Sequence, residues 1–301
     1  MTRAQLGMLL ALAAIWGAAF MLIEIALRDL APVSVAAGRV GFAAVTLALI
    51  AAARRLSLGP LLARRRQLAA AAVLNTSVPF VLIPLGQTQI DSGTAAILNA
   101  SAPLFTAVFA ALAASSQRVT GARLGGFVLG FAGVALVVGA EPGQGAGAVL
   151  GSLAVVVAAA LYAVGALYTG ARLRGLSALE IALGTMAWST LFTLPFGLWA
   201  LRGHDVGWDA GGAVLALGVV ATAVAYLLYF GVLSSAGASY AILVTYLVPA
   251  TALVYGATLL DEPVGIRQVV GLALVLAGVA LGTGTAARVR RRRSAYGISH
   301  S

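Results

Sequence analysis

The chain is a succession of apolar stretches separated by very short polar segments. Ten such stretches follow one another along its 301 residues, each near the length of about 20 residues with which a helix spans a ~30 Å hydrocarbon core. The pattern therefore predicts an all-α integral membrane protein with ten transmembrane helices. We place the spans at residues 5–24, 32–53, 67–87, 92–114, 121–139, 148–171, 177–200, 210–233, 237–259 and 264–284.

The distribution of arginine predicts the orientation of these spans. All 19 basic residues are arginine, and 15 of them fall in segments on the same side as the N-terminus. Three lie in segments on the other side, and Arg39 lies well inside a span. Because positive charge collects in cytoplasmic loops, we expect both termini to lie in the cytoplasm. The arginine-rich tail, residues 288–301, can also contact anionic membrane lipid.

Composition and charge exclude several classes of protein. The chain is 61% hydrophobic and only 9% charged, whereas soluble domains carry about 25% charge. Its net charge of +10 would suit nucleic acid, but the arginines sit where topology determinants sit, so no nucleic-acid partner is expected. The chain has no cysteine and only two histidines, both outside the spans. Together with the absence of a G-x-x-x-x-G-K-[ST] loop, this predicts neither a metal site nor a cofactor nor ATP drive.

The second half of the sequence repeats the first. At an offset of 146 residues Pro103 falls on Pro249, and Trp16 falls on Tyr162. At an offset of 145, residues 132–136 match residues 277–281 without a mismatch. We therefore expect a first five-helix repeat at 1–146, a second at 147–287, and a basic cytoplasmic tail at 288–301. Since each half has an odd number of spans, the two repeats must be inverted in the membrane.

Several motifs, taken in order, resemble the drug/metabolite transporter superfamily and its ten-helix EamA-type exporters. The motifs are Ile15–Phe20, Gly38–Phe42, the Gly-Ala-Ser-x-Ala-x-Leu-x-x-x-x-x-Pro pattern at Gly237–Pro249, Leu260–Pro263 and Leu276–Leu281. The first half is the looser match, because Gln117 stands where Glu262 stands in the second. The resemblance implies export of amino acids or related small metabolites across the bacterial inner membrane. Aromatic-amino-acid exporters of the YddG kind are the most similar subtype.

An inverted-repeat transporter binds its substrate near the bilayer midplane, between the halves. Polar and aromatic side chains within the spans are therefore the candidates for the substrate cavity. Each of them has an alternative role in hydrogen bonding between helices or in packing. The candidates are Trp16, Asn75, Ser77, Asn99, Ser101, Tyr162, Trp188, Tyr226, Thr245 and Tyr246.

Prolines and one charged pair complete the candidate set. Pro79, Pro103 and Pro249 lie within spans, where each removes a backbone hydrogen bond and can create a hinge or free a carbonyl for a ligand. Arg39 is the one charge well inside a span, and such residues are functional by default. It can neutralise a substrate carboxylate, or it can form a structural pair with Glu24; we favour the pair. These five residues are expected to be structural or gating residues.

Other functions on this sequence stay open as alternatives. A multidrug or cationic-compound carrier, or a nucleotide-sugar carrier, would use the same fold. An intramembrane enzyme is disfavoured because all nine acidic residues lie at span ends or in loops. That placement also argues against a proton-coupled cation antiporter. The small-residue pairs Gly126/Gly130 and Gly147/Gly151 favour close helix packing, either within the monomer or across a homodimer.

Overall fold

In a computed structural model, the described part of the chain consists of helices joined by short turns. The described residues are 2–113, 121–138, 145–203, 205–237, 240 and 243–282. Seven helical segments within them are long and apolar enough to cross a membrane, and three shorter apolar helices complete the ten expected spans. Gln117 and the tail at 288–301 lie outside the described residues.

The first half contributes five helical segments, two of which are interrupted. They are α1 (Arg3–Leu27), α2 (Pro32–Ala53), the interrupted third segment α4 (Arg65–Ala72), η1 (Val73–Ser77) and α5 (Val78–Gln87), the fourth segment α6 (Ser92–Asn99) and α7 (Ala102–Ala113), and α8 (Ala122–Val138). A short helix, α3 (Gly59–Ala63), lies in the second connection. Pro32 starts α2 at a position where its missing amide hydrogen has no helical partner to lose.

The second half follows the same plan. Its segments are α9 (Ala146–Arg172), α10 (Ala178–Ala200), the interrupted α11 (Trp208–Gly218), η2 (Val219–Val224) and α12 (Ala225–Ala236), then α14 (Val244–Leu259) and α15 (Ile266–Gly282). Ser177 and Glu180 form a capping box at the start of α10. In the ninth segment a turn at Leu243 precedes α14, and residues 238–239 and 241–242 lie outside the described residues.

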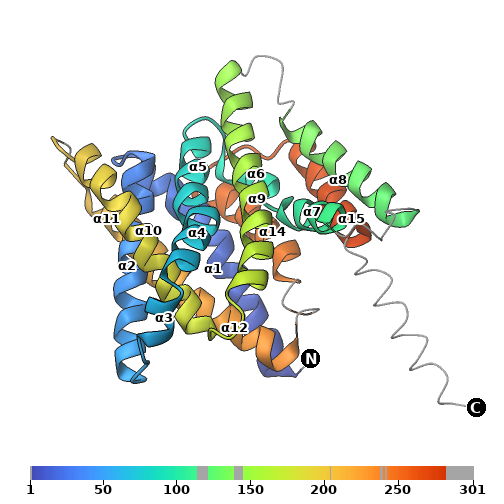
Figure 1. The fold of residues 1–301 in the computed structure, drawn as a ribbon. Coiled ribbons are helices and arrows are strands. Elements are labelled where there is room, and N and C mark those ends of the chain that lie inside the picture. The colour runs from blue at the N-terminus through green and yellow to red at the C-terminus, as the bar shows by residue number, and fades with distance from the viewer. Residues whose placement is uncertain are drawn as a thin grey trace, which may run out of the picture.

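The two halves interlock rather than lie side by side. The most extensive helix pairs join equivalent helices: α8 packs on α15, and α2 packs on α10. The first helix of each half also packs against the third and fourth segments of the other half, as α1 does with α11, α12 and α14, and as α9 does with α5, α6 and α7. Figure 1 shows α8 and α15 together at one edge of the bundle. Ten helices thus form two inverted five-helix repeats.

Glycine allows α8 and α15 to approach closely. A Cβ atom on Gly126 would lie 2.9 Å from the carbonyl oxygen of Gly278, and one on Gly133 would lie 3.0 Å from that of Gly271. These four residues, the glycine seam, replace side-chain contacts with backbone contacts. The Gly126/Gly130 pair thus packs within the monomer. So does the Gly147/Gly151 pair, because both glycines contact Gln89.

Candidate functional site

The third and eighth segments are interrupted at equivalent places near their middles. Residues Val73–Ser77 and Val219–Val224 each form a turn of π-helix within an otherwise α-helical span, and the two turns start 146 residues apart. Single π-helical turns occur frequently at functional sites. Pro79 is the second residue of α5, just after the first π turn, a position at which a helix tolerates the missing amide hydrogen of proline. The second turn contains no proline.

Arg39 on α2 reaches the second π turn. Its Nε donates to Oγ1 of Thr222 at 3.0 Å, and its guanidinium carbon lies 3.9 Å from the centroid of the Phe80 ring. The side chain is 9% exposed. The phenol groups of Tyr162 on α9 and Tyr226 on α12 lie close enough to interact with it electrostatically. Arg39 therefore interacts with helices from both halves. We call Arg39, Phe80, Tyr162, Thr222 and Tyr226 the Arg39 group.

The expected ion pair between Arg39 and Glu24 is not formed. Glu24 instead accepts a hydrogen bond from Nε2 of Gln87 at 3.4 Å, and the same nitrogen donates to the carbonyl oxygen of Phe20 at 2.9 Å. Arg39 and Glu24 lie in neighbouring spans, α2 and α1, but their side chains point to different parts of the bundle. Glu24 belongs to one end of the bundle, whereas Arg39 belongs to its interior.

The first π turn holds a neutral cluster in the corresponding place. Thr76 occupies the position equivalent to Thr222, and its Oγ1 bonds to the hydroxyl of Ser189 on α10 and to the carbonyl oxygen of Ala72. Ser77 bonds to the same serine at 2.9 Å. These buried hydroxyls satisfy one another, so Ser77 has a structural partner in this arrangement.

Asn75, in the same turn, joins two helices. Its Nδ2 donates to Oγ1 of Thr169 on α9 at 3.2 Å and to the carbonyl oxygen of Ala71 at 3.0 Å. A side chain at Gly165 would collide with this amide, so glycine is what lets Asn75 approach α9. Of the two roles weighed for Asn75, these contacts match hydrogen bonding between helices.

Aromatic rings form a row that leads to Arg39. The ring centroids of Trp16 and Tyr229 lie 5.6 Å apart, those of Tyr229 and Phe230 lie 5.6 Å apart, and those of Phe230 and Tyr226 lie 6.3 Å apart. This aromatic row, Trp16–Tyr229–Phe230–Tyr226, thus connects α1 to the tyrosine beside Arg39. Spacings of 4.5–7 Å are those of interacting aromatic pairs.

The fourth and ninth segments contribute polar groups that lack partners. The fourth segment is broken between Asn99, the last residue of α6, and Ala102, where α7 begins just before Pro103. Ser101 in the break donates to the carbonyl oxygen of Leu98 at 2.6 Å. Among the described residues, the buried Oδ1 of Asn99 and the hydroxyl of Tyr246 have no hydrogen-bond partner.

The ninth segment differs from the fourth, because Pro249 lies inside α14 and the helix continues through it. Thr245 and Tyr246 lie in the first turn of this helix and are partly exposed. Both therefore belong to the segment equivalent to the one that carries Asn99.

Trp188 lies apart from the Arg39 group. Its ring stacks on Phe192, one turn along α10, at 5.5 Å between centroids. It packs with Tyr168 against the small cluster of Leu68, Ala71 and Leu173. The structure therefore does not place Trp188 beside Arg39 or in the aromatic row.

Phe80, Thr222 and Phe230 belong to this group but were not among the candidates predicted from the sequence. One signal was present: Thr76 and Thr222, and likewise Phe80 and Tyr226, are separated by the same 146 residues as the other repeat pairs. Two equivalent polar positions in the middle of apolar spans would have marked both π turns.

Two carboxylates connect the halves at the end predicted to face outward. Glu262 accepts hydrogen bonds from the backbone nitrogen and hydroxyl of Ser92, at 3.0 and 2.8 Å, and so caps α6. Asp29 accepts from the backbone nitrogen of Gly207 at 3.0 Å, where α11 begins. Anionic groups are stabilised at helix N-termini. These contacts hold this end of the bundle together.

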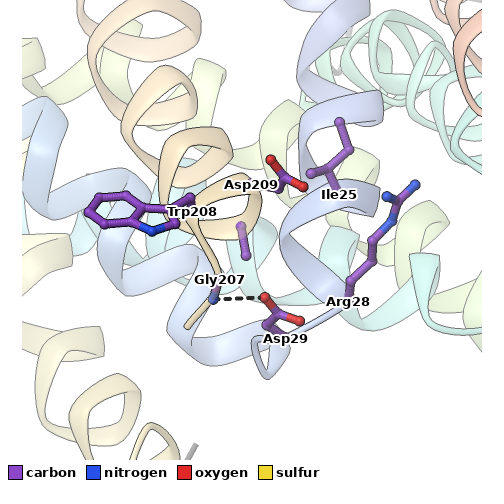
Figure 2. A pocket seen from close by; sticks show the side chains of 7 residues that line it. Ile25, Arg28, Asp29, Gly207, Trp208 and Asp209 are labelled. Atoms are coloured by element: carbon purple, nitrogen blue, oxygen red, sulfur yellow. Dashed lines mark hydrogen bonds between the residues drawn. The ribbon is translucent and has the colours of Figure 1, made fainter. Parts of the chain in front are cut away.

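A surface pocket of about 340 Å³ lies beside the second of these contacts. Figure 2 shows the side chains of Arg28, Asp29 and Asp209 around it, with Trp208 pointing away. Trp208 is 97% exposed. The pocket is formed by residues at helix ends, namely Ile25, Arg28, Asp29 and Gly207–Ala210, and so is separate from the midspan group around Arg39.

Two inverted five-helix repeats, interrupted at matching midspan positions, define the architecture of a secondary transporter. The model of the EamA-like transporter family matches the chain twice, over residues 4–139 and 149–283, and the chain belongs to that family. It is a multi-span membrane protein and a transporter.

Relatives of the chain are named as transporters. An uncharacterized transporter of Archaeoglobus fulgidus is 27% identical over 88% of this chain and 93% of its own length. A probable terminal-alkyne amino-acid exporter of Streptantibioticus cattleyicolor is 28% identical over 88% of this chain and 89% of its own length. A solved crystal structure matches 94% of this chain and 98% of its own with a TM-score of 0.66 and 15% identity, which shows the fold.

Proposed function

We propose that this protein exports amino acids, aromatic ones included, across the bacterial inner membrane by alternating access. The observation that carries the proposal is the pair of matching π turns at midspan, where side chains of both halves meet. Interrupted helices at the midplane are where such transporters bind substrate. In this proposal the halves, divided near residue 146, rock about that level, and both termini face the cytoplasm.

Three features support amino acids as the substrate class. The Arg39 group offers a cation, and the aromatic row offers apolar faces beside it. Asn99 Oδ1 and the Tyr246 hydroxyl are acceptors without described partners, which suits a substrate that donates hydrogen bonds. The relative from Streptantibioticus cattleyicolor is named as an amino-acid exporter. A permanently cationic drug fits less well, because Arg39 would repel it.

The test is counterflow in proteoliposomes of the purified protein. Vesicles loaded with unlabelled amino acids are diluted into labelled phenylalanine, threonine, methionine or lysine, with and without a pH gradient. We expect saturable accumulation of phenylalanine at least, and none in protein-free vesicles. If competent vesicles exchange no amino acid, the proposal fails, and the drug and nucleotide-sugar alternatives are then tested in the same vesicles.

A further inference from the structure

Arg39 is a buried cation that pairs with no carboxylate among the residues that the structure describes. Within the described part of the chain its Nε donates to Thr222, and no hydrogen bond is made by its two terminal nitrogens. The acids nearest in the sequence are engaged elsewhere: Glu24 with Gln87, and Asp29 with Gly207. Glu262 caps α6. Among the described residues, the positive charge therefore meets a hydroxyl, an aromatic face and two phenols, but no carboxylate.

Such an arrangement is expensive to maintain inside a membrane. A guanidinium stays charged at all accessible pH values, so it cannot escape the cost of burial by losing its proton. A cation–π contact and one hydrogen bond offset part of that cost. A second charge of opposite sign would offset more of it, because attraction between charges is strong where water is scarce.

The geometry of the unused nitrogens indicates what that charge should be. A guanidinium presents its donors in a planar fork, which matches the two oxygens of a carboxylate in a bidentate pair. With Nε already bonded to Thr222, the two terminal nitrogens remain available as one such fork. Tyr162 and Tyr226, on the second half, interact electrostatically with the same guanidinium, and a phenol hydroxyl can donate a hydrogen bond to an anion.

The aromatic row begins at this point. Tyr226 borders Arg39, and the row continues through Phe230 and Tyr229 to Trp16. A ligand with its carboxylate on Arg39 would find aromatic faces on one side. We infer that Arg39 binds the carboxylate of the transported substrate and that the aromatic row receives its apolar part. The substrates are then amphipathic carboxylates, a class that rests on the proposed function and narrows it.

The experiment compares two ligands that differ only in charge. 3-Phenylpropionate and 3-phenylpropionamide share a shape, and neither carries an amino group. Their binding to the detergent-purified protein is measured by the ligand-induced rise in melting temperature. We expect the acid to bind at least about tenfold more tightly than the amide, the factor that corresponds to about 1.4 kcal/mol.

Matched variants assign that preference to one residue. Arg39→Gln should remove the preference for the acid, whereas Arg66→Gln, which removes a charge from an exposed position, should retain it. Equal binding of acid and amide by the unaltered protein overturns the inference, and so does a preference that survives Arg39→Gln. Where Arg39→Gln does not yield folded protein, Arg39→Lys keeps the charge but removes the fork. A preference at least about threefold smaller then supports the inference, and an unchanged one overturns it.

This binding test is independent of transport. Absence of amino-acid counterflow would overturn the proposed function and leave the acid–amide comparison intact. Conversely, if amino acids show counterflow but the acid and the amide bind equally tightly, the proposed function stands and the role of Arg39 in binding the carboxylate is overturned.

Discussion

The two π turns use the same backbone device to hold different chemistry. In the first, Thr76 and Ser77 share hydrogen bonds with Ser189, and the cluster is neutral and satisfied. In the second, the equivalent Thr222 accepts from Arg39, a cation with donors to spare. The π-helical backbone thus occurs in both halves, whereas a charged side chain contacts only the second of the two turns. Symmetry of the fold therefore supplies the place where a site can form, while departure from symmetry decides which half bears the charge.

The largest effect should come from the ring that supports the charge. Phe80 is buried, packs in the cluster around α2 and α10, and stacks on Arg39, whereas its equivalent, Tyr226, is partly exposed. Phe80→Ala should lower the free energy of unfolding by about 3 kcal/mol, and Tyr226→Ala by about half as much. Unfolding in mixed micelles measures both. Equal losses would mean that the two equivalent rings do not differ in packing.

A second test concerns the cap that joins the halves at one end. Glu262→Ala removes the acceptor of hydrogen bonds from Ser92 and should cost about 2 kcal/mol of stability, because those bonds involve a charged group. Glu262→Gln copies Gln117, the residue of the first half, and should cost about half as much. Unfolding in mixed micelles again provides the measurement, with Asp205→Ala as an exposed acidic control outside the helices. If the cap does not contribute to stability, the Glu262 variants and the control will have the same free energy of unfolding.

The paired threonines compare the two turns most directly. Thr222→Val removes the acceptor of Arg39 and should lower counterflow about tenfold, since a hydrogen bond to a charged group is worth about 1.5–3 kcal/mol. Thr76→Val removes a neutral bond and should change counterflow less than about twofold. Both variants lose a buried hydrogen bond, so both should be slightly less stable. If the two rates fall together, the difference between the turns has no bearing on transport.

The smallest effect is expected at Asn75, whose equivalent is Ala221. Asn75→Ala makes the first turn resemble the second and removes the bond to Thr169, a change worth about 0.6 kcal/mol for hydrogen bonds between membrane helices. The reverse substitution, Ala221→Asn, places an amide where the present side chain is fully buried, and should destabilise the protein more. Melting temperatures of the two variants in one detergent provide the comparison.

The sequence predicted the spans well because hydropathy and length alone define them. The third span, placed at 67–87, corresponds to Arg65–Gln87 in the structure. The π turns were not predicted. The spans that contain them are apolar overall, so one extra residue in a turn does not change their hydropathy. Prolines pointed near the first turn, but the second has none.

The partner of Arg39 shows why sites are harder to predict than spans. Sequence position fixes the depth of a residue in the membrane, and on depth alone Glu24 was a reasonable partner. It does not fix the direction in which the side chain leaves its helix, which depends on packing between helices. Arg39 faces Thr222 and Phe80, residues 183 and 41 positions away in the chain, and neither has a charge that would have drawn attention.

The glycine seam has a consequence for how the protein tolerates a single charge. Gly126 and Gly271 occupy equivalent positions in the two repeats, and so do Gly133 and Gly278. Gly126 contacts Gly278 and Gly271 contacts Gly133, which is the reciprocal pattern of an isologous dimer interface. Had the halves been two identical chains about a strict twofold axis, every side chain would occur twice, and a second guanidinium would repel the first. Here the position equivalent to Arg39 holds Thr185. Because the two repeats are parts of one chain, equivalent positions can hold different residues. A single buried cation is therefore possible here, whereas a symmetric dimer of identical chains would always bury two.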